Sequence, residues 1–197
     1  ALSYAGANAT NSVAITEEWI GPGAPIGAWS TGGNLNTART QLAGAGTSSS
    51  SALAFGGDSG SITAVTESYN GSNWTNVNSM NTGRSQLAGV GTQTAALAFG
   101  GEAPPLTTAT EVWGGTNWAA SPGSLNTARG VMGAAGTSTS ALAFGGETPG
   151  NTAITESWSG SSWTEVADLN TARRGLEGFG ASNTSALAFG GFTTTFV

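Results

Sequence analysis

Short apolar segments alternate with runs of Gly, Ser, Thr and Asn along the whole chain, and one apolar segment returns at a nearly constant interval. Ala-Leu-Ala-Phe-Gly-Gly occurs four times, with successive phenylalanines 44 or 45 residues apart. Ala1-Leu2-Ser3-Tyr4-Ala5-Gly6 is a degenerate fifth copy. A fixed interval of this size is the sequence signature of a repeat architecture. The four phenylalanines are Phe55, Phe99, Phe144 and Phe189.

Two further markers recur with the same period. Leu-Asn-Thr-Ala-Arg, or the variant Met-Asn-Thr-Gly-Arg, ends at Arg39, Arg84, Arg129 and Arg173. A Thr-Glu pair, followed two residues after the glutamate by an aromatic residue, places its carboxylate at Glu17, Glu67, Glu111 and Glu156. A second tryptophan then follows at Trp29, Trp74, Trp118 and Trp163.

Each unit is predicted to form four short strands separated by turn residues. In the second unit these strands fall at 86–92, 96–101, 107–113 and 117–120. Leu53 and Phe55 should share one face of their strand, because successive strand residues point to opposite sides. Helix is not expected, since no segment sustains an apolar period of 3.6 and glycine is frequent throughout.

A four-stranded sheet of this size leaves an apolar face and bare edges, so it is not expected to be stable alone. Stacking such sheets radially, as the blades of a propeller, buries the faces and leaves only short edges. The glycine- and alanine-rich strand after each arginine suits the crowded centre of such a ring. The sequence therefore predicts an all-β propeller of four-stranded antiparallel blades.

The whole chain, 1–197, is expected to form one domain, with joints between repeats near 35–39, 80–84, 125–129 and 169–173. Four joints connect five blades, which is the favoured count, with an incomplete blade at each end. The alternative is four blades, in which C-terminal inner strands complete a sheet with N-terminal outer strands. In that arrangement residues 1–6 and 186–191 compete for one position.

Together these features resemble the kelch repeat, which has a double glycine after an apolar strand, then an aromatic residue and a tryptophan, and an arginine opening the next unit. The amino-acid sequence of the repeats is also similar to that of repeat proteins of marine bacteriophages, for which virion or tail-fibre roles are suspected. The resemblance implies an interaction module. It does not imply the activity of galactose oxidase, a kelch enzyme whose copper chemistry requires His and Cys.

The amino-acid composition further restricts the set of possible functions. Charged residues make up 8% of the chain, the net charge is −6, and there is no histidine or cysteine. All five basic residues are arginines, and they are spread along the repeats, which argues against a nucleic-acid partner. Without His, Cys or Lys, the common catalytic pairs and His-containing metal sites cannot be built. We therefore expect no enzyme activity, no cofactor, no metal and no membrane insertion.

The repeated arginines and glutamates could bind an anion or act as acids and bases. A structural role is the stronger interpretation, because a charge present in every repeat serves every repeat alike. We expect buried, hydrogen-bonded pairs at the blade junctions, formed from the arginines and glutamates given above.

Candidate ligand-binding residues lie where the repeats differ. Trp29 follows an enlarged loop, 21–27, that contains Pro25, and Pro104 and Pro105 occupy another variable loop. Binding residues are often found on loops held by a rigid scaffold. The aromatic residues in the regular repeat positions are expected to pack between blades instead.

The favoured hypothesis is a non-catalytic structural or adhesive binding module, carried on a virion as a tail or capsid decoration or otherwise outside a cell. Its partner would be a protein or a cell-surface glycan, with self-assembly or attachment to a larger particle. The alternative hypothesis is a glycan-binding, lectin-like propeller.

Overall fold

The computed structural model describes residues 2–7, 12–20 and 28–193. These residues form strands β1 to β17 and contain no helix, so the all-β prediction is confirmed. Accordingly, no helix in this part of the chain is long and apolar enough to cross a membrane.

Three sheets have four antiparallel strands each, in chain order from one edge to the other. The second sheet contains β4 (Ala43–Ser48), β5 (Ser51–Phe55), β6 (Thr66–Tyr69) and β7 (Trp74–Val77). The third contains β8 (Ala88–Gly91), β9 (Ala96–Phe99), β10 (Thr110–Trp113) and β11 (Trp118–Ala120). The fourth contains β12 (Gly133–Gly136), β13 (Ala141–Phe144), β14 (Thr155–Trp158) and β15 (Trp163–Glu165).

The strands are shorter than their sequence patterns suggested. In the third sheet the second strand was expected to reach residue 101, but β9 ends at Phe99. The reason is the conformation of Gly100 and Gly101, whose φ angles of 60° and 92° turn the backbone out of the sheet. Both amides instead donate to loop carbonyls, those of Ala109 and Arg129.

The two remaining sheets are smaller. The first contains β1 (Leu2–Ala7), β2 (Ser12–Ile20) and β3 (Ala28–Thr31), and the last contains β16 (Glu177–Ser182) and β17 (Ser185–Phe189). The pairing register shows which strands of a complete four-stranded sheet these two sheets lack. Ser3 of β1 pairs with Glu17 as Ala54 of β5 pairs with Glu67, so β1 is a second strand. Within the described residues, the first sheet has no equivalent of β4, and the last has no equivalents of β6 and β7.

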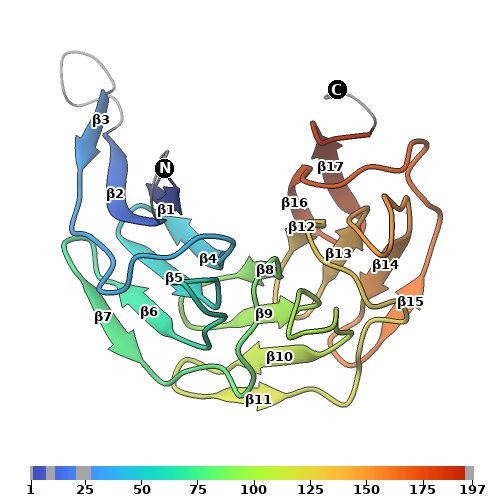
Figure 1. Cartoon of the computed structure of the whole chain (residues 1–197), viewed down its shortest axis with the longest axis horizontal. Helices are drawn as coiled ribbons and strands as arrows, with labels where there is room; N and C mark the ends of the chain where they lie inside the picture. Colours follow the sequence, from blue (N-terminus) through green and yellow to red (C-terminus); the bar gives the residue numbers. More distant parts are fainter. Residues whose placement is uncertain (1, 8–11, 21–27, 194–197) are drawn as a thin grey trace.

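The five sheets follow one another along an open arc, with the first and the last at its two ends (Figure 1). The glycine- and alanine-rich strands β4, β8, β12 and β16 line the inside of the arc, and β7, β11 and β15 lie on the outside. Neighbouring inner strands contact one another directly, β4 with β8, β8 with β12, and β12 with β16. The fold thus presents blade-like sheets in the radial order that the repeats require.

The core consists of the junctions between successive sheets. Leu53 and Phe55 are completely buried beneath Trp118 of the next sheet, and the rings of Phe55 and Trp118 meet edge-on with centroids 4.9 Å apart. Burying a side chain of this size contributes about 1.5–3 kcal/mol. Phe99 and Trp163 repeat the contact at 4.7 Å one junction further on. Each sheet therefore depends on its successor to cover its apolar face.

Candidate functional site

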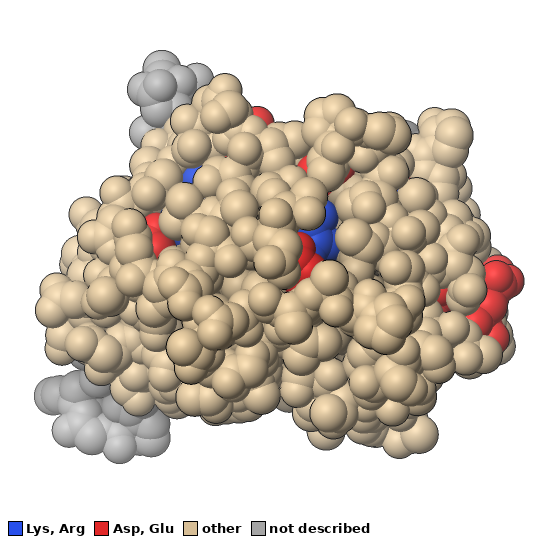
Figure 2. Space-filling view, turned by 90° about the horizontal axis from the view of Figure 1, so that it is seen from below, with Lys and Arg blue, Asp and Glu red and all other residues tan. Residues whose placement is uncertain are grey.

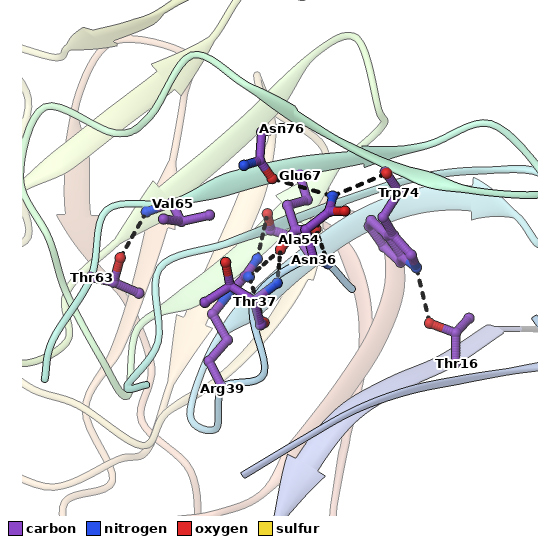
Figure 3. A network of polar contacts seen from close by, with 10 residues as sticks. All are labelled: Thr16, Asn36, Thr37, Arg39, Ala54, Thr63, Val65, Glu67, Trp74 and Asn76. Atoms are coloured by element: carbon purple, nitrogen blue, oxygen red, sulfur yellow. Dashed lines mark hydrogen bonds and ion pairs between the residues drawn. The ribbon is translucent and has the colours of Figure 1, made fainter. Parts of the chain in front are cut away.

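The charged residues of the second sheet gather in one buried cluster. Arg39, at the end of the joint 35–39, forms an ion pair with Glu67 on β6, and both side chains are completely buried. Asn36 donates from its backbone amide, at 2.6 Å, and from Nδ2, at 2.8 Å, to Oε2 of the same carboxylate. Figure 3 shows the guanidinium and the asparagine amide converging on Glu67 from the joint. The cluster ties the joint to the sheet that follows it.

The next two sheets repeat this cluster. Arg84 Nη2 lies 2.9 Å from Oε1 of Glu111, and Arg129 Nη1 lies 2.6 Å from Oε1 of Glu156. In each, the asparagine of the joint donates twice to the other carboxylate oxygen, as Asn81 to Glu111 and Asn126 to Glu156. The structure thus brings together three of the four arginines and three of the four glutamates that the repeats single out. Arginine and glutamate of a pair always belong to the same repeat unit, joint plus sheet.

Burial shapes the electrostatics of these clusters. Removal from water lowers the pKa of Arg84 and of Arg129, and the facing carboxylates, Glu111 and Glu156, oppose that shift. A guanidinium nevertheless remains charged at neutral pH. Because each carboxylate accepts hydrogen bonds from both an arginine and an asparagine, it is fully engaged and is not placed to transfer protons to a substrate. The arrangement supports a structural role.

The asparagine of the joint was not among the residues predicted to have a role. Its signal was present in the sequence, because Asn36, Asn81 and Asn126 recur with the same period as the arginines. Their function depends on a carboxylate about 30 residues later in the chain, and sequence distance gave no reason to connect the two.

The fourth arginine and the fourth glutamate stand apart. The side chain of Arg173, before the last sheet, makes one long hydrogen bond of 3.5 Å to the carbonyl of Ala188 and no ion pair within the described part of the chain. Glu17, on β2 of the first sheet, is exposed, and no arginine pairs with it among the described residues. The two residues lie in the sheets at opposite ends of the arc (Figure 1).

The ligand-binding candidates are dispersed. Trp29 on β3 is 50% exposed, and its ring meets that of Trp19 edge-on with centroids 5.8 Å apart. Pro104 and Pro105 are exposed in the loop between β9 and β10, two sheets away. Pro25 and the loop 21–27 lie outside the described residues. The candidates that the structure describes therefore do not share a surface site.

A cavity of about 860 Å³ lies on the inside of the arc, along the four inner strands. Its walls are mainly Gly, Ala, Ser and Thr, and Glu177 at the start of β16 is the one charged side chain that lines it. Glycoside hydrolysis by the usual mechanism needs two carboxyl groups that face the substrate. No cluster of three potential metal ligands occurs within the described ranges.

Comparisons with models of known protein families and with curated proteins found no match for this chain.

Proposed function

We propose that this protein is a non-catalytic structural or adhesive binding module, built from kelch-type blade repeats. The observation that carries the proposal is the recurrent Arg–Glu–Asn cluster. Three arginines and three glutamates of a chain with only 16 charged residues are buried in these clusters, where they hold joints to sheets. The recurrent charged side chains of these three repeats are therefore buried inside the protein.

The remaining surface suits contact with a large partner. Figure 2 shows a face formed mostly by uncharged residues, with a few small acidic and basic patches. A surface of this kind lacks the basic stripe of a nucleic-acid-binding protein. Neutral loops of Ser, Thr, Asn and Gly can instead make many hydrogen bonds to a protein or a glycan.

We further propose that the sheets are blades of a propeller and that the protein is displayed on a virion, as a tail or capsid decoration, or otherwise outside a cell. Counting the five sheets along the arc supports five blades. The unpaired Arg173 and Glu17 support the alternative, in which the incomplete end sheets combine into a single blade. The proposed location rests on the resemblance to bacteriophage repeats that was drawn from the repeat sequence alone.

Immunoelectron microscopy of the native source tests this proposal. We expect antibody label on the surface of particles or cells, and purified protein that binds the same surface. Label confined to the cytoplasm, together with a soluble protein that binds no particle, would contradict it.

The half-exposed Trp29 favours a second candidate function, glycan binding. Tryptophan faces stack on sugar rings, and Trp29 and Trp19 present their rings together. A glycan array with the native chain and with Trp29→Ala tests this candidate. Binding that disappears in the variant supports it, and an array without signal for either protein removes it.

A further inference from the structure

The tip of the hairpin between β8 and β9 carries a side chain that binds the preceding sheet. Nε2 of Gln93 donates to Oγ of Ser68 at 2.9 Å and to the carbonyl of Tyr69, both on β6. Its Oε1 accepts a hydrogen bond from Oγ of Ser51 on β5, also at 2.9 Å. The indole of Trp113, in the same sheet as Gln93, donates to the carbonyl of Gln93 at 2.9 Å and holds the tip in place. Gln93 therefore connects the third sheet to two strands of the second.

The hairpin between β16 and β17 repeats this arrangement with an asparagine. Asn183 lies three residues before its Ala-Leu-Ala-Phe segment, as Gln93 does. Its Nδ2 donates to Oγ of Ser157 at 2.9 Å and to the carbonyl of Trp158 at 3.2 Å. Its Oδ1 accepts from Oγ of Ser140 at 2.8 Å. The two serines belong to the fourth sheet and occupy the same repeat positions as the serines that bind Gln93.

The junction between the third and the fourth sheet differs at all three of these positions. The tip residue of the fourth sheet is Ser138, and the positions that face it in the third sheet hold Ala95 and Val112. The side chains of alanine and valine offer no hydrogen-bonding group. Within this chain, an amide tip thus follows a sheet with two serines, and a serine tip follows a sheet with an alanine and a valine. The tip residue and the two residues that receive it vary together.

The junction between the first and the second sheet uses another polar pair. Glu18 occupies the receiving position after the repeat glutamate, and the hydroxyl of Tyr69 donates to its carboxylate. In the next two sheets a tryptophan replaces this tyrosine, and its indole donates to the tip of its own hairpin, as Trp113 to Gln93 and Trp158 to Ser138. The polar contacts of the described junctions therefore differ, although the repeat is the same.

The apolar contacts, in contrast, are nearly identical from junction to junction. Phe55 meets Trp118 and Phe99 meets Trp163 at centroid distances of 4.9 and 4.7 Å. Such contacts do not distinguish one sheet from another, so a sheet could pack against the wrong neighbour, and misassembly is a characteristic failure of repeat proteins. Discrimination requires positions at which a wrong partner leaves a polar group without a hydrogen bond.

We propose that the tip residue and its two receiving residues form a recognition site by which each sheet selects the sheet before it. An amide tip such as Gln93 recognises two serines, whereas facing Val112 it would lose its side-chain partners. A serine tip such as Ser138 fits the alanine and valine, whereas it is too short to span a pair of serines as Gln93 does. This selection concerns the assembly of the sheets and is independent of the partner that the surface binds.

Exchanging two repeats in the gene tests this recognition. When residues 80–124 and 125–168 change places, the Phe–Trp contacts are kept and Gln93 again faces two serines. Ser138, however, then faces two serines as well, and Asn183 faces the Ala–Val pair of the third sheet. We expect the midpoint of thermal unfolding to fall by about 3–8 °C. Adding Ser138→Gln and Asn183→Ser to the exchanged chain restores both matches and should recover most of this loss.

The same two substitutions in the native order provide the matched control. There they create two mismatches, so they should lower the midpoint that they raise in the exchanged chain. Opposite signs in the two orders support recognition, because a defect of the substitutions themselves would act in one direction in both. An effect of the same sign in both orders, or none in either, would overturn the proposal. An exchanged chain that folds only with the two substitutions also supports it.

A second measurement uses the native order and does not require the exchanged chain to fold. Ser68→Val alone places Gln93 against a valine and should lower the midpoint by about 2–6 °C. Adding Gln93→Ser and Ser51→Ala reproduces the residues of the junction between the third and the fourth sheet and should recover most of the loss. Ser79→Val, at an exposed serine outside the hairpins, is the control and should shift the midpoint by less than about 2 °C. A triple variant no more stable than Ser68→Val contradicts the proposed recognition.

Discussion

Phe55 of the second sheet and Trp118 of the third meet edge-on, with ring centroids 4.9 Å apart. The same tryptophan donates its indole hydrogen to Thr66, which also belongs to the second sheet. The junction therefore combines an apolar contact with a directed hydrogen bond, and Trp163 forms the same pair of contacts with Phe99 and Thr110. Two sheets joined in this way have a fixed relative orientation.

Truncating the phenylalanine of a junction should destabilise the protein strongly. Phe99→Ala leaves a cavity beneath Trp163 and should lower the free energy of unfolding by about 3–5 kcal/mol. Chemical denaturation followed by tryptophan fluorescence measures the change. Val166→Ala is the control, because Val166 is exposed, and it should change the free energy by less than about 0.5 kcal/mol. Equal effects of the two substitutions would show that the junction is not the core.

Removing the carboxylate of a cluster should also be costly. Glu111→Gln leaves Arg84 buried without its counter-ion, and we expect a loss of about 3–5 kcal/mol in unfolding free energy. Replacing both partners, as Arg84→Met with Glu111→Leu, should cost less than the single substitution, because no uncompensated charge remains. Glu177→Gln, on an exposed side chain outside the clusters, serves as the control. A double variant less stable than Glu111→Gln would contradict this account of the cluster.

Close approach of the inner strands requires glycine at specific positions. A Cβ atom at Gly89 would lie 2.4 Å from the ring of Phe55, whereas a Cβ at Gly114 would meet nothing within 4 Å. Gly89→Ala should therefore lower the free energy of unfolding by about 1–3 kcal/mol through overpacking. Gly114→Ala should have little effect. Combining Gly89→Ala with Phe55→Leu should recover part of the loss, and strict additivity of the two would mean that the predicted clash does not occur.

Stability should fall in alkaline solution through Tyr69. Burial raises the pKa of Tyr69, and its hydrogen bond to Glu18 raises it further. The folded state therefore keeps this phenol protonated at a pH where the unfolded chain, with a pKa of about 10, ionises. The contribution is fully present below pH 10 and is lost as the pH rises toward the folded pKa. Denaturation midpoints measured across this range should fall more steeply for the native chain than for Tyr69→Phe, and parallel curves would refute the assignment.

The repeat period was enough to predict strands and four-stranded sheets, because Leu and Phe alternate with Ala in every copy and glycines follow each copy. The curvature of the array was not predictable in this way. It depends on how closely β4 approaches β8, which is set by contacts such as that between Gly89 and Phe55 across two repeats. No local pattern reports that distance, so the sequence could not distinguish a closed circle from the open arc of Figure 1.

The charged pairs, too, were predicted only in part from the sequence. Because an arginine and a glutamate recur in the repeats, a structural role was predicted for both Arg84 and Glu111. The structure places these two residues together. That they share one repeat unit, with Asn81 as a third member, followed only from the structure, because strand register decides which residues meet across a sheet. Trp29 occupies a regular repeat position on β3, and its exposure comes from its place at the end of the arc.

Because the arginine and the glutamate of each of the three pairs come from the same stretch of about 45 residues, each complete repeat carries its own counter-ion. Duplication or deletion of a whole repeat in the gene would leave the interior electrically balanced. A breakpoint between the arginine and the glutamate of one repeat would leave an unpaired charge on each side of the break. Arrays of this kind can therefore change length by recombination without new compensating mutations, provided that the crossover respects the joints.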